Sequence, residues 1–391
     1  MVLIKPFEVE EWMDRLETTP GVLNVAETCC ESVSISELAA LSTDESVKLQ
    51  DITSRRLTYG AIPGTDVTRQ RIANLYGDVK LDQVVLTQGA IGANFLLLFS
   101  LIGPGDHVIC EYPTYQQLYE VPKSLGAEVS LWKLKEGNRF VPDVSELEGL
   151  VRSNTKLIIL NNPNNPTGAT INKEVLSAIV AFAKERDIII MGDEVYRPLF
   201  HSLPAGEEIP PSVIDLGYDK AVSTSSMSKA FSLAGIRVGW IATRDPSILE
   251  AVNSCRNYTT ISVSQFDDSV AGYALSDAVR VNLLQRNIEL ARTNIALLEA
   301  FVNKHSSVLS WVKPTAGTTA MVQFRKNGSV VKDSKFCLEV LDNTGVLIMP
   351  GCTCFGEGED FPGYMRFGYV CHTDVLKEGL NRLDAYIEKA F

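Results

Sequence analysis

The chain has 391 residues, a size that predicts roughly two or three domains rather than one simple core. Its 48 acidic and 36 basic residues give a net charge of −12, and no long basic run occurs, so nucleic acid and anionic membranes are not expected partners. The longest apolar run, Phe95–Ile102, is far shorter than the ~20 residues that a membrane span needs.

The cysteines and the first residues favour a cytoplasmic protein. None of the eight cysteines forms a C-x-x-C motif, and their spacing fits neither a zinc site nor a disulfide framework, so reduced thiols are expected. The four histidines are far apart in sequence, and no metal site is expected. Residues 1–6 are too few for the apolar part of a signal peptide.

The N-terminal region predicts two short helices with an extended segment between them. Val9–Thr18 has apolar residues at helical spacing, and Leu23–Ser32 follows as the extended segment. The pattern Ser34-Ile-Ser-Glu37 is a capping box that opens the second helix.

Between about 48 and 275, β-rich runs alternate with helical stretches. This alternation predicts an α/β sheet, mostly parallel, covered on both faces, with ligands bound at the carboxyl ends of the strands. The expected strands are Gln83–Gln88, His107–Tyr112, Glu128–Leu134, Lys156–Asn161, Ile188–Gly192, Ala221–Thr224 and Arg237–Ala242, and the clearest helices are Ala90–Leu101, Val144–Arg152 and Lys173–Arg186.

A long helical region, Ser264–Lys304 with a break near Ser276, is expected to connect two domains. Its predicted apolar stripe is Val281, Leu284, Ile288, Ala291, Ile295 and Leu298. Beyond it we expect strands at Thr319–Arg325, Val346–Met349 and Tyr364–Tyr369 and helices at 333–343 and 374–390. We therefore predict a large domain, 48–275, and a smaller α+β domain made of 1–47 and 276–391, because chain ends commonly lie close together.

The stretch Ser223–Trp240 places Lys229 among small hydroxyl and glycine residues, with Arg237 eight positions later. An amine is a nucleophile only when neutral, and burial beside another cation lowers its pKa. Small hydroxyls, backbone N–H groups and an arginine also suit a phosphate. The stretch indicates either a lysine that binds a phosphorylated aldehyde or an exposed lysine in an ordinary loop.

Other candidate residues lie at strand ends. Gly89 follows a strand and opens an apolar helix, which makes either a phosphate seat or a plain strand-to-helix turn. Asp193 ends an apolar strand, where it needs hydrogen-bond donors or a cation such as a protonated ring nitrogen, and Glu194 is an equal candidate. Arg366, between apolar residues on a predicted strand, would bind a substrate carboxylate or an internal acid.

Together these motifs resemble the fold type I pyridoxal-phosphate enzymes, specifically the class I and II aminotransferase family. The resemblance spans about Tyr59 to Arg366. It is carried by Asn161-Asn-Pro-Asn-Asn-Pro-Thr-Gly168, Gly192-Asp-Glu-Val-Tyr196 and Ser226-x-Ser-Lys229…Gly-x-Arg-x-Gly239. It implies an α/β large domain with a mostly parallel seven-stranded sheet, a smaller α+β domain, bound pyridoxal 5'-phosphate and an amino-acid substrate.

The resemblance also implies a role for each matched residue. Lys229 would bind the cofactor covalently and later take the Cα proton, and Arg366 would bind the substrate α-carboxylate. Tyr59 resembles the tyrosine that reaches the phosphate of the neighbouring subunit, which implies a homodimer with shared sites. For the cofactor, Asp193 would pair with the ring nitrogen, Asn165 and Tyr196 would bind the ring hydroxyl, Tyr115 would stack on the ring, and Gly89, Ala90, Ser226 and Arg237 would hold the phosphate.

Two segments depart from the common members of this family. Asn24–Ser32 stands where a glycine-rich segment usually closes over the substrate, and Arg256–Ser264 also differs. Both are more similar to enzymes that resemble capreomycidine synthase, which cyclise an arginine derivative. Transamination is the favoured reaction, with racemisation or cyclisation of a cationic amino acid such as arginine as the alternative. Glu27 or Glu31 could then bind the substrate cation, although surface acids are the preferred interpretation of both.

A third hypothesis is a non-catalytic pyridoxal-phosphate-binding regulator, like the aminotransferase-like half of some transcription factors. Those proteins carry an attached DNA-binding domain. The sequence has no spare N-terminal domain and no basic face, so this hypothesis ranks last.

Overall fold

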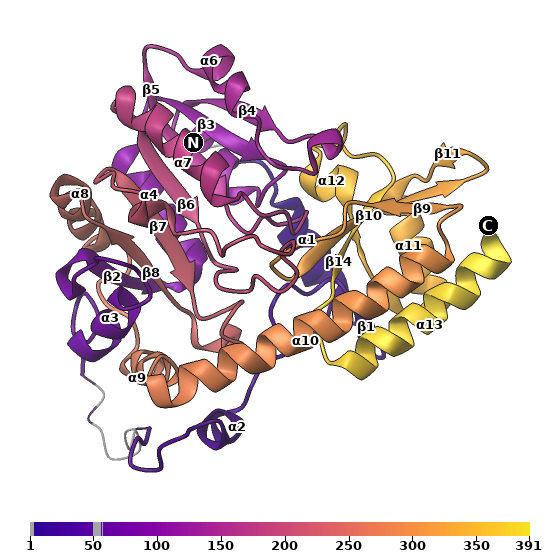
Figure 1. The fold of residues 1–391 in the computed structure, drawn as a ribbon, viewed down its shortest axis with the longest axis horizontal. Helices are drawn as coiled ribbons and strands as arrows, with labels where there is room; N and C mark the ends of the chain where they lie inside the picture. Colours follow the sequence, from indigo (N-terminus) through magenta and orange to yellow (C-terminus); the bar gives the residue numbers. More distant parts are fainter. Residues whose placement is uncertain (1–3, 50–55, 57) are drawn as a thin grey trace.

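The computed structural model describes residues 4–49, 56 and 58–391 and contains a large twisted sheet with helices on both of its faces (Figure 1). The sheet has seven strands in the order β2-β8-β7-β6-β5-β3-β4. Strand β8 runs antiparallel to both β2 and β7, and the other four neighbouring pairs are parallel, so the prediction of a mostly parallel seven-stranded sheet is confirmed. The strands are β2 (Val84–Gln88), β3 (His107–Tyr112), β4 (Glu128–Lys133), β5 (Thr155–Asn161), β6 (Ile189–Asp193), β7 (Ala221–Ser226) and β8 (Val238–Thr243).

Side chains on the central strands alternate between two cores. Leu157 and Ile159 of β5 join a core with the helices α4 (Gly89–Leu101), α5 (Gln117–Ser124) and α8 (Pro246–Arg256). Ile158 and Leu160 point the other way and join the core that contains α7 (Lys173–Glu185). A strand buried on both faces is apolar throughout, which explains why these runs could be recognised from the sequence.

Several helices differ from expectation or were not expected. The stretch predicted as a helix over Val144–Arg152 is a 3₁₀ turn, Val144–Glu146, followed by the one-turn helix α6 (Leu147–Leu150). Helices α3 (Asp66–Ala73), α5 and α8 have no clear predicted counterpart. They are short, and α5 even contains Pro122.

A smaller antiparallel sheet lies at the other end of the molecule (Figure 1). It is built on β10 (Thr319–Lys326) and β14 (Tyr364–Gly368), with β9 (Leu309–Trp311), β11 (Ser329–Val330) and β13 (Met349–Pro350). Helices α11 (Asp333–Thr344), α12 (Gly351–Phe355) and α13 (Thr373–Ala390) pack around it.

The N-terminal segment packs against this smaller region. Strand β1 (Leu23–Asn24) pairs with β12 (Val346–Leu347), and α1 (Glu8–Leu16) contacts α12. Trp12 Nε1 donates a hydrogen bond to the Ile348 carbonyl at 3.2 Å. Helix α2 (Ile35–Ala40) has the predicted capping box between Ser34 and Glu37. The division into domains 48–275 and 1–47 with 276–391 stays a prediction.

The connecting helical region is broken as expected, into α9 (Gln265–Ala274) and α10 (Asp277–Lys304). The predicted apolar stripe is wrong at its start, because Val281 is 61% exposed. The buried face of α10 includes Asn287 and Asn294, whose amides donate to the carbonyls of Ala230 and Tyr369 at 2.8 Å each. A prediction from apolar residues alone could not include these satisfied polar residues.

Among the described residues, no helix is both long and apolar enough to cross a membrane. The same part of the chain contains no group of three or more His, Cys, Asp or Glu side chains that could hold a metal ion.

Candidate functional site

A cavity of about 670 Å³ lies at the carboxyl ends of the parallel strands and is closed on one side by residues 26–29 and Arg366. Among the residues predicted from the sequence, Ala90, Tyr115, Asn165, Asp193, Tyr196, Ser226, Lys229, Arg237 and Arg366 line it. Gly89 lies behind Arg237. Tyr59 is outside the cavity lining and is 80% exposed.

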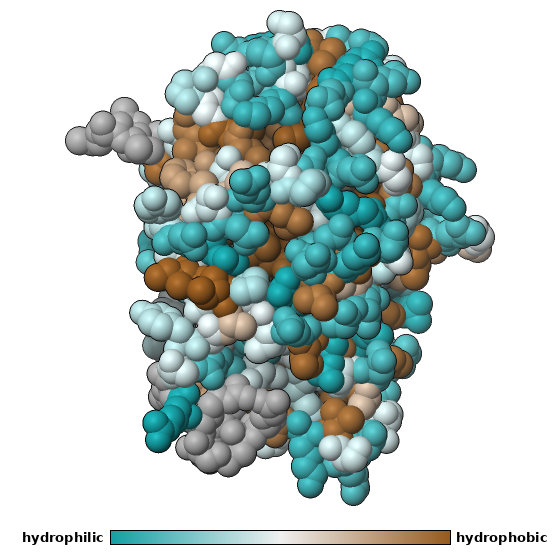
Figure 2. Space-filling model, turned by 90° about the vertical axis from the view of Figure 1, so that its left-hand side faces the viewer, coloured by the Kyte–Doolittle hydropathy of each residue, from teal (hydrophilic) through white to brown (hydrophobic). Residues whose placement is uncertain are grey.

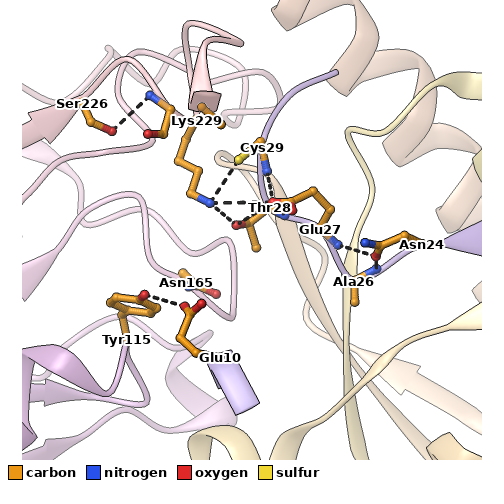
Figure 3. Close-up of polar contacts among 12 residues, drawn as sticks. Glu10, Asn24, Ala26, Glu27, Thr28, Cys29, Tyr115, Asn165, Ser226 and Lys229 are labelled. Atoms are coloured by element: carbon orange, nitrogen blue, oxygen red, sulfur yellow. Dashed lines mark hydrogen bonds and ion pairs between the residues drawn. The ribbon is translucent and has the colours of Figure 1, made fainter. Parts of the chain in front are cut away.

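Lys229 projects into the cavity from the loop that follows β7 (Figure 3). Its Nζ donates to Thr28 Oγ1 at 2.6 Å and to Cys29 Sγ at 3.2 Å, and it lies 3.8 Å from Glu27 Oε1. Burial works to lower the pKa of Lys229, but Cys29, Tyr196 and Glu27 outweigh it and raise the pKa above its ordinary value. The free amine is therefore held as an ammonium.

Glu27 supplies the negative charge that faces this ammonium. Its Oε1 accepts hydrogen bonds from the backbone N–H groups of Thr28 at 2.6 Å and Cys29 at 2.8 Å. Burial alone would raise the pKa of Glu27, but the Lys229 charge and the Cys29 and Thr28 donors lower it to about 2. The preferred interpretation of Glu27 as a surface acid is therefore wrong, because its side chain lines the cavity. Glu31 instead accepts from the His372 N–H.

Asp193 and Glu194, equal candidates in the sequence, point to different places. Asp193 lines the cavity at 3% exposure and accepts hydrogen bonds from Asn94 Nδ2 at 3.0 Å and Val195 N–H at 3.2 Å. Burial raises the pKa of Asp193 to about 6, against the opposing effect of the Asn94 hydrogen bond. Glu194 accepts from Ser212, Val213 and Ser223 in the protein interior, so Asp193 is the carboxylate available to a ligand.

The start of α4 forms a seat next to Arg237. Gly89 has φ +71°, and a Cβ there would approach Arg237 Nη2 to 2.8 Å. A Cβ at Gly239 would approach the Gly89 carbonyl carbon to 2.3 Å, so both glycines permit the close contact of α4, β8 and Arg237. No side chain caps the N-terminus of α4, and Ser226 also lines the cavity. Free N–H groups, a hydroxyl and a guanidinium suit a phosphate.

Arg366 is a buried cation without an acidic partner. Its Nη1 donates to Asn165 Oδ1 at 3.2 Å and its Nη2 donates to the Ala26 carbonyl at 2.7 Å. Within the described part of the chain, its Nε has no hydrogen-bond partner and no carboxylate forms an ion pair with it. The internal acid considered as the alternative is thus not found there, and a buried guanidinium in this state favours an anionic ligand.

Two aromatic residues, Tyr115 and Tyr196, also line the cavity. Tyr115 packs against Phe7 with ring centroids 4.8 Å apart, and its hydroxyl donates to Glu10 Oε1 at 2.6 Å (Figure 3). Tyr196 is buried, which raises its pKa despite the opposing effects of Lys229 and Arg366. Tyr112 lies in the core against Tyr119.

Sequence reasoning missed the cavity residues Asn94, Thr28 and Cys29. Asn94 had a usable signal, since it is a polar residue in the apolar run of a helix that starts at a predicted ligand seat. Thr28 and Cys29 lie in the segment identified only as divergent, and nothing in the sequence showed that it folds against Lys229.

These residues fit a flat, phosphorylated ring with a basic ring nitrogen and an aldehyde. Asp193 can pair with the ring nitrogen, since no cation forms an ion pair with it among the described residues. The seat at α4 can take the phosphate, and Lys229 is the amine that faces the space between them.

Comparisons with known proteins agree with this geometry. The family model for aminotransferase class I and II matches residues 35–383. A crystal structure of a PLP-dependent aminotransferase from Streptococcus suis is 38% identical, covers 99% of this chain and 98% of that chain, and superposes with a TM-score of 0.90.

Two curated relatives differ in their reactions. The aspartate aminotransferase of Thermotoga maritima is 28% identical over 81% of this chain and 79% of its own length. The capreomycidine synthase of Streptomyces vinaceus is 29% identical over 76% of this chain and 72% of its own length.

Proposed function

The chain belongs to the aminotransferase class I and II family and is a pyridoxal 5'-phosphate enzyme, and we propose that it transfers the amino group of an amino acid with Lys229 as the proton acceptor. One observation carries this proposal. The amine of Lys229, the carboxylate of Asp193 and the guanidinium of Arg366 all open onto one cavity.

Each predicted residue has a place in this proposal. Asp193 would hold the ring nitrogen in its protonated form, and Asn165 and Tyr196 would bind the ring hydroxyl. Tyr115 would stack on the ring. The phosphate would lie against Gly89, Ala90, Ser226 and Arg237.

Pyridoxal phosphate supplies an electron sink that makes the Cα–H bond of a bound amino acid breakable. Arg366 would hold the α-carboxylate of the substrate through paired N–H donors, which fixes where Cα lies. The amine of Lys229 faces the same cavity and would take the proton of Cα. In transamination the same amine would hold that proton and give it back.

A second reaction class has its own support. Residues 26–29 form a fixed wall of the cavity in place of a glycine-rich closing segment, and capreomycidine synthase is among the relatives. Racemisation or cyclisation would begin with the same proton transfer to Lys229 and would need no keto acid.

One experiment separates these reactions. The purified holoenzyme is incubated with single L-amino acids in deuterated water, with and without a keto acid. Transamination predicts product that depends on the keto acid. Deuterium at Cα with the D-enantiomer and no need for keto acid would mean racemisation, and absence of any Cα exchange would contradict a catalytic role.

We also propose a homodimer with shared sites. Tyr59 and Tyr258 are 80% and 90% exposed, large exposures for aromatic side chains. The side of the molecule that carries α3 and α8 shows several exposed apolar patches (Figure 2). Sedimentation analysis should give a dimer, and Tyr59→Phe should weaken cofactor binding at unchanged mass if its hydroxyl reaches the phosphate of the partner subunit.

We further propose a cytoplasmic location. All eight cysteines are free, which fits a reducing compartment. Fractionation of the native host would test this assignment.

A further inference from the structure

One side of the cavity carries an acidic wall, defined here as Glu10, Glu11, Asp14, Glu17 and Glu27. The first four belong to α1 or directly follow it, and Glu27 lies on the segment beyond β1. Spacing of four and then three residues puts Glu10, Asp14 and Glu17 on one side of the helix. Val9, Trp12 and Met13 of α1 are buried, and Val9 and Met13 line the cavity together with the acids, so packing holds this helix along the cavity.

Ion pairs neutralise little of the charge of the acidic wall, although Glu10 accepts a hydrogen bond from the Tyr115 hydroxyl. Among the described residues, none of its four α1 acids forms an ion pair, and Glu27 pairs only with Lys229. Partial burial, and then the charges of Glu27, Glu10 and Asp14, raise the pKa of Glu17. Like charges four residues apart and acids at a helix C-terminus both destabilise a helix. Glu10 and Glu11 lie in the first turn of α1, where acids are favourable. The repulsion between Glu10 and Asp14 and the position of Glu17 at the C-terminus are unfavourable, and a bound cation would relieve both.

Arg366 gives a second, independent sign of a ligand. It is 2% exposed, lines the same cavity, and its Nε has no partner in the described part of the chain. Its Nη2 donates to the carbonyl of Ala26, the residue before Glu27. A carboxylate bound by Arg366 would therefore lie beside the segment that carries Glu27.

Covalent engagement of Lys229 would also release Glu27. The ammonium of Lys229 is the cation that Glu27 faces in the structure. If Nζ were bound to the cofactor aldehyde, it would no longer be free to pair with Glu27, which would stay an anion held by the N–H groups of Thr28 and Cys29. With Arg237 at the proposed phosphate seat, the cavity would then offer Arg366 to a substrate carboxylate and five acids to the other end of the molecule.

We propose that this cavity selects amino acids whose side chain ends in a cation, an ammonium or a guanidinium, with Arg366 binding the α-carboxylate and the acidic wall binding the side-chain charge. The inference rests on the proposed function, since it names the substrate class of the same site.

The test compares charged amino acids with uncharged ones of similar length. Dissociation constants for the holoenzyme are measured by calorimetry with L-arginine against L-citrulline and with L-lysine against L-norleucine. The charged member of at least one pair should bind about tenfold more tightly. Tighter binding of arginine than of citrulline would identify a guanidinium as the preferred side-chain cation. Tighter binding of lysine than of norleucine would identify an ammonium. The preference should shrink at 0.5 M salt, because salt screens exposed charges.

Two variants with a matched control locate the effect. Glu27→Gln and, separately, Glu17→Gln should lower the charged-to-neutral preference at least about threefold. Glu31→Gln should leave it unchanged, because Glu31 lies in the same segment but outside the cavity and accepts from the His372 N–H.

Failure of this inference can be told apart from failure of the proposed function. Equal affinities within both pairs, together with conversion of neutral amino acids, would overturn the inference and leave the proposed function standing. If no amino acid binds and none changes the cofactor absorbance, both fail.

Discussion

Lys229 and Arg366 are the residues on which the proposed chemistry of the cavity depends. Both are buried cations, and both donate to the segment Ala26–Cys29, Arg366 through the Ala26 carbonyl and Lys229 through Thr28 and Cys29. Each therefore has a fixed direction before any ligand binds. Such preorganisation is what positioning and proton transfer require.

Replacing Lys229 with Ala should abolish turnover and Cα deuterium exchange while cofactor still binds without a covalent bond. The proposed phosphate and ring contacts come from other residues, whereas the proposed proton acceptor is lost. Exchange is measured by mass spectrometry of the amino acid, and bound cofactor by absorbance after gel filtration. Lys220→Ala is the control, since Lys220 pairs with Asp187 at the surface. Undiminished exchange in the Lys229 variant would remove this assignment.

Replacing Asp193 with Ala should slow Cα exchange by about 10²-fold or more, because a buried anion that stabilises a developing charge is lost. The pKa of Asp193 is raised to about 6, so its charge is present above that pH and cofactor affinity should fall as the pH drops below it. Affinity is measured by fluorescence titration between pH 5 and 8. Asp187→Ala, at an exposed surface pair, should change neither property.

Replacing Glu27 with Gln should lower the free energy of unfolding of the cofactor-free protein at neutral pH by on the order of 1 kcal/mol, after allowance for solvent screening. Glu27 has its folded pKa lowered from 4.5 to about 2. Its stabilisation is therefore complete above pH 4.5 and is lost as the pH falls towards 2. Urea midpoints of wild type and variant should converge over that range, and a constant difference would argue against the ion pair with Lys229.

At the scale of single residues, the sequence predicted which residues belong to the site better than it predicted the contacts that each of them makes. Asp193 and Arg366 were found because a charged residue in an apolar strand must have a partner. The choice between Asp193 and Glu194 needed the structure, since Asp193 is the last residue of β6 and Glu194 turns to Ser212, Val213 and Ser223 in the interior. Glu27 was named as a candidate but interpreted as a surface acid, because its contact with Lys229 joins residues 202 positions apart.

At the scale of elements, the contact of α4 with β8 shapes the proposed phosphate seat. Gly89 and Gly239 meet there, and Arg237 folds over Gly89. The elements themselves were predictable, since β2 and α4 lie within one residue of their expected starts. The close contact between α4 and β8 was not predictable, because it depends on two residues far apart in the chain, Gly89 and Gly239, both lacking a Cβ atom.

Replacing Gly89 with Ala should weaken cofactor affinity at least about tenfold, with only a modest loss of stability. The new Cβ would approach Arg237 Nη2 to 2.8 Å and would sit at φ +71°, so Arg237 must move. Gly103→Ala is the matched control, because a Cβ there meets nothing within 4 Å. Equal cofactor affinity in both variants would contradict a phosphate seat at α4.

Helix α10 shows the limit of periodicity. The predicted stripe counted apolar residues, whereas the helix buries Asn287 and Asn294, each with its amide satisfied by a carbonyl. Buried polar residues of this kind are placed by partners distant in the chain, and a local pattern cannot find them.

At the scale of the whole molecule, the segment after β1 joins the two sheets around the cavity. Cys30 N–H donates to the Lys229 carbonyl at 3.4 Å, and Glu31 N–H donates to the Val370 carbonyl at 2.9 Å. The sequence predicted the sheet, the family and the cofactor, because local motifs with a strong pattern indicate each of them. It could not predict that residues 26–29 close one side of the cavity, since their position follows from how the N-terminal segment packs between distant parts of the chain.

The central claim is that Lys229 is the residue that binds pyridoxal phosphate and carries its proton chemistry. The most direct measurement is borohydride reduction of the holoenzyme, which makes the lysine–cofactor link permanent, followed by peptide mapping by mass spectrometry. The account predicts one reduced pyridoxyl-phosphate adduct per chain, on the peptide that contains Lys229 and on no other lysine. An adduct on a different lysine, or a cofactor-loaded protein that forms none, would contradict it.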